Sequence, residues 1–339
     1  EILRCLVGSE MCIRDRMHTP QETMADALLY LRIYFAGIIF VFIYNVGSSI
    51  LRAMGDSRRP LYYLIVCSVV NIILDLLLIL VIPLGVLGAA IATLIAQAVS
   101  AVLVTVTLMY RTEGMKLCLS QIRMYKRMLQ SILKIGLPAG FEAIMYSISN
   151  IIVQVSINNF GVDTMAAWTA YSKIDFIFWM INSAFGISVM TFVGQNYGAG
   201  KWDRIRRGTK ICLGMALISA VSVSIILMSA ERFLFGIFVN DAGVVEIGIR
   251  MMNVIAPAYL LFAFIEVFSG ALRAQGAVVV STLITMVGIC VLRMIWVTLV
   301  AAHGTLEQVI ICYPITWAAG ALAMSIYYIY KQRKIFQAR

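Results

Sequence analysis

The sequence predicts an all-α polytopic membrane protein, and three features of its composition support this fold class. Hydrophobic residues account for 61% of the 339 residues, and the mean hydropathy is +0.91. Charged residues account for 13%, whereas they make up about a quarter of a typical soluble domain. The apolar residues fall in runs of about 20, the length that an α-helix needs to cross a bilayer. Because backbone groups in lipid must be hydrogen-bonded internally, we expect these runs to be transmembrane helices.

About nine spans are expected, joined by short connections. In chain order they start near Ala27, Leu61, Val86, Ser131, Met165, Ile211, Val244, Val278 and Val309. Most of the 27 Lys and Arg fall in alternate connections, at positions 52–59, 111–134, 201–210, 273 and 331–339. By the positive-inside rule these connections and the C-terminus are cytoplasmic, in a multi-pass protein of the cytoplasmic membrane. The net charge of +10 is therefore read as a topology signal, with lipid and not nucleic acid as the surroundings.

Residues 1–16, EILRCLVGSEMCIRDR, do not fit the rest of the chain. They carry six charges and lack the basic start and apolar core of a signal peptide. We expect them to be an adapter or assembly artefact and exclude them from the fold.

An internal repeat defines the domain organisation. Leu51-Arg52-Ala53 follows the first expected span, and Leu272-Arg273-Ala274 follows the seventh, so the repeat unit is about six helices. Six is an even number, which makes the two lobes parallel and pseudo-symmetric. Two full lobes would need about twelve spans, so we expect the first lobe to lack about three. The predicted domains are a partial N-terminal lobe of about three spans at 17–112, a cytoplasmic linker at 113–130 and a C-terminal lobe of about six spans at 131–339.

Several segments, in this order and spacing, resemble the multidrug and toxic compound extrusion (MATE) family of cation-coupled antiporters. They are ILRAMGDSRRP, VNIILD, LGVLGAAIATLIAQ, KIGLPAGFE, GQNYGAGKWDRIRRG and SGALRAQG. The last departs from the family pattern because AVVVS follows it. The resemblance implies export of amphipathic, cationic drugs or toxic compounds by alternating access. It also implies coupling to H⁺ or Na⁺, no cofactor beyond that ion, and a monomer.

Ionisable side chains inside spans are costly and are functional candidates by default. Glu142 is the first candidate, because it follows Pro138 inside a span and shares a helical face with Tyr146 and Asn150. The family resemblance adds that a Glu soon after GLP is a recurrent coupling residue. A structural carboxylate tied to a neighbouring helix is the alternative. Glu266 is the second candidate, between Tyr259 and Ser269 on its span, and a helix–helix hydrogen bond is its alternative.

Asp175 is the third candidate, since Trp168, Tyr171 and Asp175 lie on one helical face and would suit a lipophilic cation. The alternative is an aromatic belt in which Lys173 snorkels to the interface. Asp75 resembles a family carboxylate, with a structural role favoured slightly over a functional one. We expect Arg293 to be structural, with a charge that could neutralise a carboxylate in its own lobe.

Two prolines inside spans, Pro138 and Pro257, are expected to let their helices bend. The chain contains no HExxH, GxSxG or CxxC pattern, and GQNYGAGK lacks the spacing and hydroxyl of a phosphate-binding loop. We therefore expect no enzyme activity, no catalytic residues, no metal site and no ATP hydrolysis, and a small organic substrate. Two alternatives to an antiporter stay open: a lipid-linked precursor flippase of a related fold and a non-transporting membrane subunit.

Overall fold

The computed structural model describes residues 21–110, 116–300 and 304–337, and the chain divides into two compact units, Glu1–Arg123 and Met124–Arg339. The expected artefact at 1–16 and the start of the predicted linker, 113–115, lie outside the described residues. The described residues form helices and connections without a strand. Eight helical segments among them are long and apolar enough to cross a membrane. A ninth is present if Leu28–Ala36 and Ile38–Ala53, which meet at 45°, form one broken span, in agreement with the prediction of about nine.

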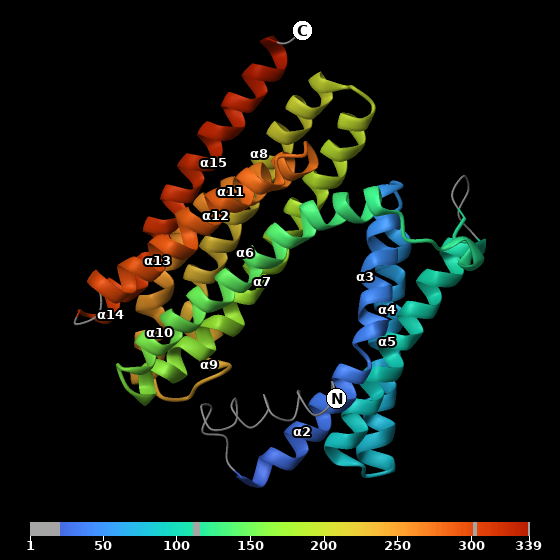
Figure 1. Ribbon diagram of the computed structural model, residues 1–339. Coiled ribbons are helices and arrows are strands. Elements are labelled where there is room, and N and C mark those ends of the chain that lie inside the picture. The colour runs from blue at the N-terminus through green and yellow to red at the C-terminus, as the bar shows by residue number, and fades with distance from the viewer. Residues whose placement is uncertain (1–20, 111–115, 301–303, 338–339) are drawn as a thin grey trace. The chain divides into compact units, whose positions relative to one another are not determined.

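The described residues of the first unit form four α-helices, and α5 packs against the other three (Figure 1). These helices are α2 (Gln21–Ala36), α3 (Ile38–Ala53), α4 (Arg58–Asp75) and α5 (Gly85–Tyr110), and α4 continues into a π-helical segment, Leu76–Val81. Tyr44 and Leu51 of α3 and Val104 and Leu108 of α5 form the buried core of this unit. The break between α2 and α3 is at Gly37, where a side chain would collide with Leu94 of α5.

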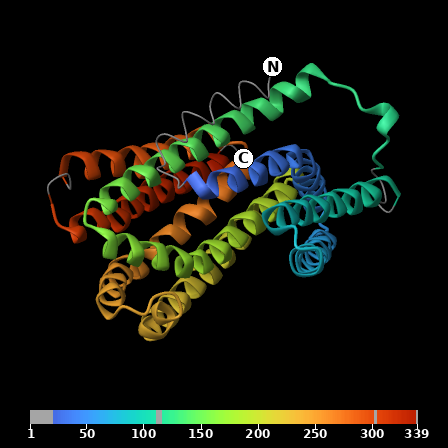
Figure 2. The same cartoon turned by 90° about the horizontal axis from the view of Figure 1, so that it is seen from below.

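The second unit contains the remaining helices, which lie side by side in both views (Figures 1 and 2). They are α6 (Lys126–Asn158), α7 (Val162–Gly198), α8 (Trp202–Ser229), α9 (Glu231–Gly236), α10 (Ala242–Ile255), α11 (Tyr259–Ala274), α12 (Val278–Thr285), α13 (Leu292–Ile295), α14 (Leu306–Ile310) and α15 (Cys312–Gln337). The most deeply buried helix is α11, which packs against α7, α8 and α15. Two glycines permit its closest approach to α7, because a side chain on Gly270 would lie 2.8 Å from the carbonyl oxygen of Gly186.

The repeated LRA motif ends a helix in the same way at both of its positions. In the first copy the backbone N–H of Asp56 donates to the carbonyl of Leu51, and Gly55 has a φ of +92°. In the second copy the N–H of Ala277 donates to the carbonyl of Leu272, and Gly276 has a φ of +78°. This is the six-to-one bond of a Schellman motif, in which a left-handed glycine satisfies the last carbonyls of the helix. Both copies of the repeat therefore end their helices with the same C-terminal capping motif.

The structure adds detail to the expected helix boundaries at four places. Residues 126–130, expected in the linker, are the first five residues of α6. The described part of the linker before them contains one short 3₁₀ helix, Leu119–Gln121. Pro138 lies within α6, which continues through it as one helix. Pro257 lies in a 3₁₀ segment, Ala256–Ala258, that interrupts the α-helical hydrogen bonding between α10 and α11. The span expected from Val278 alternates short α-helices with π-helical segments at Met286–Val291 and Trp296–Val300.

Candidate functional site

The second unit contains two pockets that share Tyr146 as a lining residue. The larger one, here called the aromatic pocket, has a volume of about 470 Å³. It is lined by Tyr146, Asn150, Gln154, Trp168, Tyr171, Ser172, Asp175, Phe176, Trp179, Ile255, Tyr313 and Trp317. The other, here called the carboxylate pocket, has a volume of about 350 Å³. It is lined by Ala139, Glu142, Ala143, Tyr146, Phe262, Ile265, Glu266, Ser269, Arg273 and Thr285.

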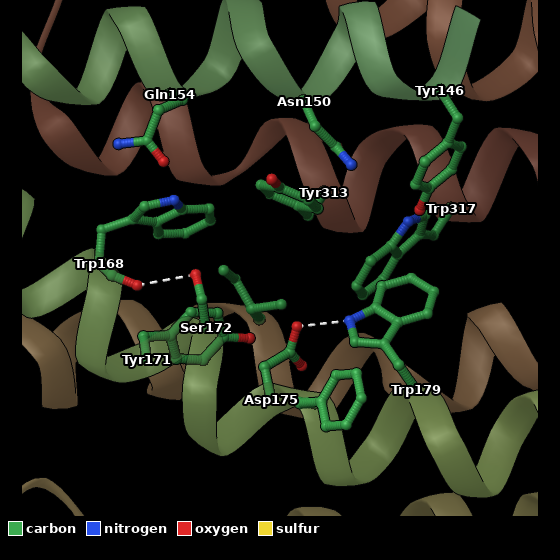
Figure 3. Close-up of a pocket in the computed structure, with 12 residues that line it drawn as sticks. Tyr146, Asn150, Gln154, Trp168, Tyr171, Ser172, Asp175, Trp179, Tyr313 and Trp317 are labelled. Carbon is green, nitrogen blue, oxygen red and sulfur yellow. Dashed lines mark hydrogen bonds between the residues drawn. The ribbon is translucent and has the colours of Figure 1, made fainter. Parts of the chain in front are cut away.

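Opposite walls of the aromatic pocket come from α6 and α7 (Figure 3). Helical spacing brings Trp168, Tyr171 and Asp175 of α7 to the same wall, as the sequence predicted. Rings from α15 complete the enclosure, with the centroid of Tyr313 5.9 Å from that of Trp168 and 5.5 Å from that of Trp317. Aromatic faces beside a carboxylate attract organic cations, so this wall has the chemistry to bind one.

Asp175 is fixed by hydrogen bonds at both of its carboxylate oxygens. The indole N–H of Trp179, one turn along α7, donates to Oδ2 at 2.5 Å, and the hydroxyl of Tyr259 from α11 donates to Oδ1. The hydroxyls of Tyr171 and Tyr259 are 3.0 Å apart, and the ring of Phe178 stacks on Tyr259 with centroids 3.8 Å apart. Asp175 is half-buried and lines the pocket, so the network holds this carboxylate at the pocket wall.

The carboxylate pocket brings together two acids and one base. The Nη2 of Arg273 donates to both oxygens of Glu142, at 2.7 and 2.9 Å, and joins the last turn of α11 to α6. Glu266 lies about two helical turns before Arg273 on α11, directly against Gly186 of α7, where any added side chain would meet the carboxylate. The hydroxyl of Ser269 is 2.9 Å from that of Ser281 on α12. The pocket is thus lined by two carboxylates, those of Glu142 and Glu266, and one guanidinium, that of Arg273.

The structure distributes most of the predicted residues over these two pockets. Glu142, Glu266 and Ser269 line the carboxylate pocket, while Asn150, Tyr171 and Asp175 line the aromatic pocket. Tyr259 was predicted on the same span as Glu266, two turns earlier; it lines neither pocket, and its hydroxyl donates to Oδ1 of Asp175.

Asp75 lies in the other unit and lines neither pocket. Its Oδ1 atom, like the Nδ2 atom of Asn71 one turn earlier, is buried without a hydrogen-bond partner among the described residues. The role of Asp75 therefore stays a prediction.

The sequence did not identify three residues that complete the site. Arg273 was counted only as a charge of a cytoplasmic loop, although its guanidinium reaches back along α11 to Glu142. The ring walls of Tyr313 and Trp317 come from α15, and no local pattern links that helix to α7. Among the described residues, no group of three or more His, Cys, Asp or Glu side chains is placed to hold a metal ion.

Arg293 differs from the expectation that it would neutralise a carboxylate. It has no ion-pair partner among the described residues. Its Nη1 donates instead to the side-chain oxygen of Asn150 at 3.1 Å, and its guanidinium carbon lies 4.2 Å from the centroid of the Tyr313 ring. Two carboxylates of the second unit have other partners: Glu142 pairs with Arg273, and Asp175 accepts from neutral donors.

Comparison with known proteins identifies a single family. A family model described as MatE matches residues 10–77 and 138–299. "Probable multidrug resistance protein YoeA" of Bacillus subtilis is 28% identical over 98% of this chain and 75% of its own length. "Probable multidrug resistance protein YpnP" of the same organism is 29% identical over 97% of this chain and 74% of its own length. A solved structure titled "Crystal structure of MATE in the bent conformation" has a TM-score of 0.89 at 20% identity, covering 99% of this chain and 75% of that one, and it supports the fold.

Proposed function

The chain belongs to the MatE family of multidrug transporters, and from this membership we propose that it is an antiporter that exports amphipathic, cationic compounds in exchange for H⁺ or Na⁺. It is a multi-pass membrane protein, and the basic connections favour a cytoplasmic C-terminus. The proposal assigns the coupling ion to the carboxylate pocket and the substrate to the aromatic pocket.

The observation that carries the proposal is the pair of Glu142 and Arg273 beside a second acid, Glu266. A carboxylate in a desolvated site needs a cation or a proton to remain there. In this conformation Arg273 supplies the cation to Glu142. A proton or Na⁺ that binds Glu142 replaces that charge and frees the guanidinium, which loosens the contact between α6 and α11. Binding of the coupling ion is thereby linked to a change in helix packing, as alternating access requires.

The aromatic pocket supports the other half of the exchange. Asp175 offers the negative charge, and the rings of Trp168 and Tyr313 offer faces for an organic cation. Tyr146 lines both pockets, so a substrate in one pocket and an ion in the other act on the same side chain. This shared wall provides a physical route by which the two ligands exclude one another.

The test is efflux of a fluorescent organic cation from proteoliposomes under an imposed proton or Na⁺ gradient. We expect Glu142→Gln to abolish the gradient dependence while binding of the cation to the purified protein persists. Glu246→Gln is the matched control, because it removes an exposed carboxylate that lies 3.8 Å from Arg232 and lines neither pocket. Gradient-driven efflux by Glu142→Gln at the wild-type rate would contradict the assignment of the coupling site.

A further inference from the structure

Arg293 is a fully buried cation in the interior of the second unit. It lies in the short helix α13 between two π-helical segments, and its side chain has 0% exposure. A guanidinium remains protonated in proteins, so this side chain is charged whatever its surroundings. An intramembrane charge of this kind is costly unless an anion or several acceptors compensate it.

The contacts of Arg293 within the described residues compensate the charge only in part. The Nη1 atom donates to Asn150, and the guanidinium lies over the rings of Tyr313 and Tyr146, 4.2 and 5.7 Å from their centroids. The Nε and Nη2 atoms are buried and have no hydrogen-bond partner among these residues. Cation–π contacts lower the cost of the charge but do not satisfy these two donors.

All three contact residues of Arg293 line the aromatic pocket. Asn150 projects from α6, across the pocket from Asp175 on α7 (Figure 3). The pocket therefore has two poles: a carboxylate on the α7 wall and a guanidinium immediately behind the opposite wall. A ligand that carried charges of both signs would match both poles at once.

We propose that Arg293 determines specificity and that the aromatic pocket prefers amphipathic compounds carrying a carboxylate as well as a cation over compounds carrying the cation alone. This inference rests on the proposed function, which places the substrate in that pocket. The ligand carboxylate approaches beside Asn150, between the rings of Tyr146 and Tyr313, and accepts hydrogen bonds from the free donors of Arg293. Guanidinium and carboxylate are geometrically matched for such bonds, whereas an ester leaves the arginine charge uncompensated.

The test compares binding of rhodamine B, a zwitterion, with binding of its ethyl ester, which keeps the cation and lacks the carboxylate. Fluorescence anisotropy of each dye is titrated with the purified full chain in detergent. We expect wild-type protein to bind rhodamine B at least about tenfold more tightly than the ester, as one charge-assisted hydrogen bond or more would give. Arg293→Met should remove the preference, and Arg293→Lys should retain part of it. Lys173→Met is the matched control, since it removes an exposed cation of α7 that lines neither pocket.

Equal binding of the two dyes by the wild-type protein would overturn the inference, and this result does not depend on whether any variant folds. An undiminished preference in Arg293→Met would overturn it as well. Failure of the proposed function has a different signature: a preference for the zwitterion in binding, with no gradient-driven flux of either dye in proteoliposomes. That outcome supports the role of Arg293 in binding and contradicts coupled transport.

Discussion

Neutralising the two partners of the Glu142–Arg273 pair, singly and together, measures how strongly α6 and α11 are held by charge. The variants are Glu142→Gln, Arg273→Gln and the double variant. Glu142→Gln replaces the carboxylate with an amide of the same length, whereas Arg273→Gln removes the charge and also shortens the side chain, so the double variant is needed to isolate the interaction. If the pair is the link that a coupling ion releases, the two substitutions must not be independent.

The geometry sets the expected magnitudes. The pair is short, at 2.7 Å, and the side chains are 12% exposed for Glu142 and 30% exposed for Arg273. Exposed ion pairs contribute about 0.2–1 kcal/mol, while removing one partner of a fully buried pair costs about 3–5 kcal/mol. This pair lies between those limits. Arg273→Gln leaves the more buried charge alone beside Glu266, so we expect about 3 kcal/mol for it and about 2 kcal/mol for Glu142→Gln.

The double variant should cost about 3 kcal/mol, which gives a coupling energy of about 2 kcal/mol. The assay is equilibrium unfolding in mixed micelles of dodecyl sulfate and a non-ionic detergent, followed by tryptophan fluorescence from the five tryptophans. Additive single effects, within about 0.5 kcal/mol, would refute the reasoning, because they would mean that the two charges do not stabilise one another in the folded protein. A larger cost for Glu142→Gln than for Arg273→Gln would refute the burial argument.

Three further outcomes follow from close contacts. Gly270→Ala should destabilise the protein by about 1–3 kcal/mol in the same unfolding assay, because its new carbon would lie 2.8 Å from the backbone oxygen of Gly186. Gly214→Ala is the control: its new carbon meets no atom within 4 Å, so the substitution should be neutral or stabilising. Asp241→Ala removes the side chain that accepts from two backbone N–H groups at the start of α10 and should cost about 1 kcal/mol, with Asp241→Asn retaining most of it. Tyr259→Phe preserves the ring that stacks on Phe178 but removes the hydroxyl that donates to Asp175. Binding of rhodamine B should therefore weaken several-fold, while the free energy of unfolding should change by less than for Gly270→Ala. Unchanged binding would contradict an orienting role for this hydroxyl.

Local pattern was sufficient to predict the helices and part of the aromatic pocket. Apolar runs of membrane length must become helices in lipid, so the span count followed from composition alone. Trp168, Tyr171 and Asp175 share a wall because the period of the α-helix places them there, whatever surrounds the helix. The LRA repeat was recognisable from sequence identity alone, and its role in ending a helix follows from the glycine after each copy.

Charge pairing was not predictable in the same way. Arg273 looked like a loop charge because the positive-inside rule considers position along the chain and not where a long side chain reaches. Arg293 was expected to meet a carboxylate, yet Asn150 and two tyrosine rings, from helices remote in sequence, surround it. Which acid meets which base depends on how helices rotate and cross, and that is set by packing of many side chains at once.

The sequence by itself therefore determined that this protein is a helical membrane protein with a repeated architecture, and it named carboxylates worth testing. Those properties depend on hydrophobicity and helical period, which act along the chain. The tertiary structure alone decided that Glu142 is paired, that Tyr259 serves Asp175, and that an unneutralised arginine lies behind the aromatic pocket. These are relations between helices distant in sequence, and in a low-dielectric interior they decide which charges are available to a ligand.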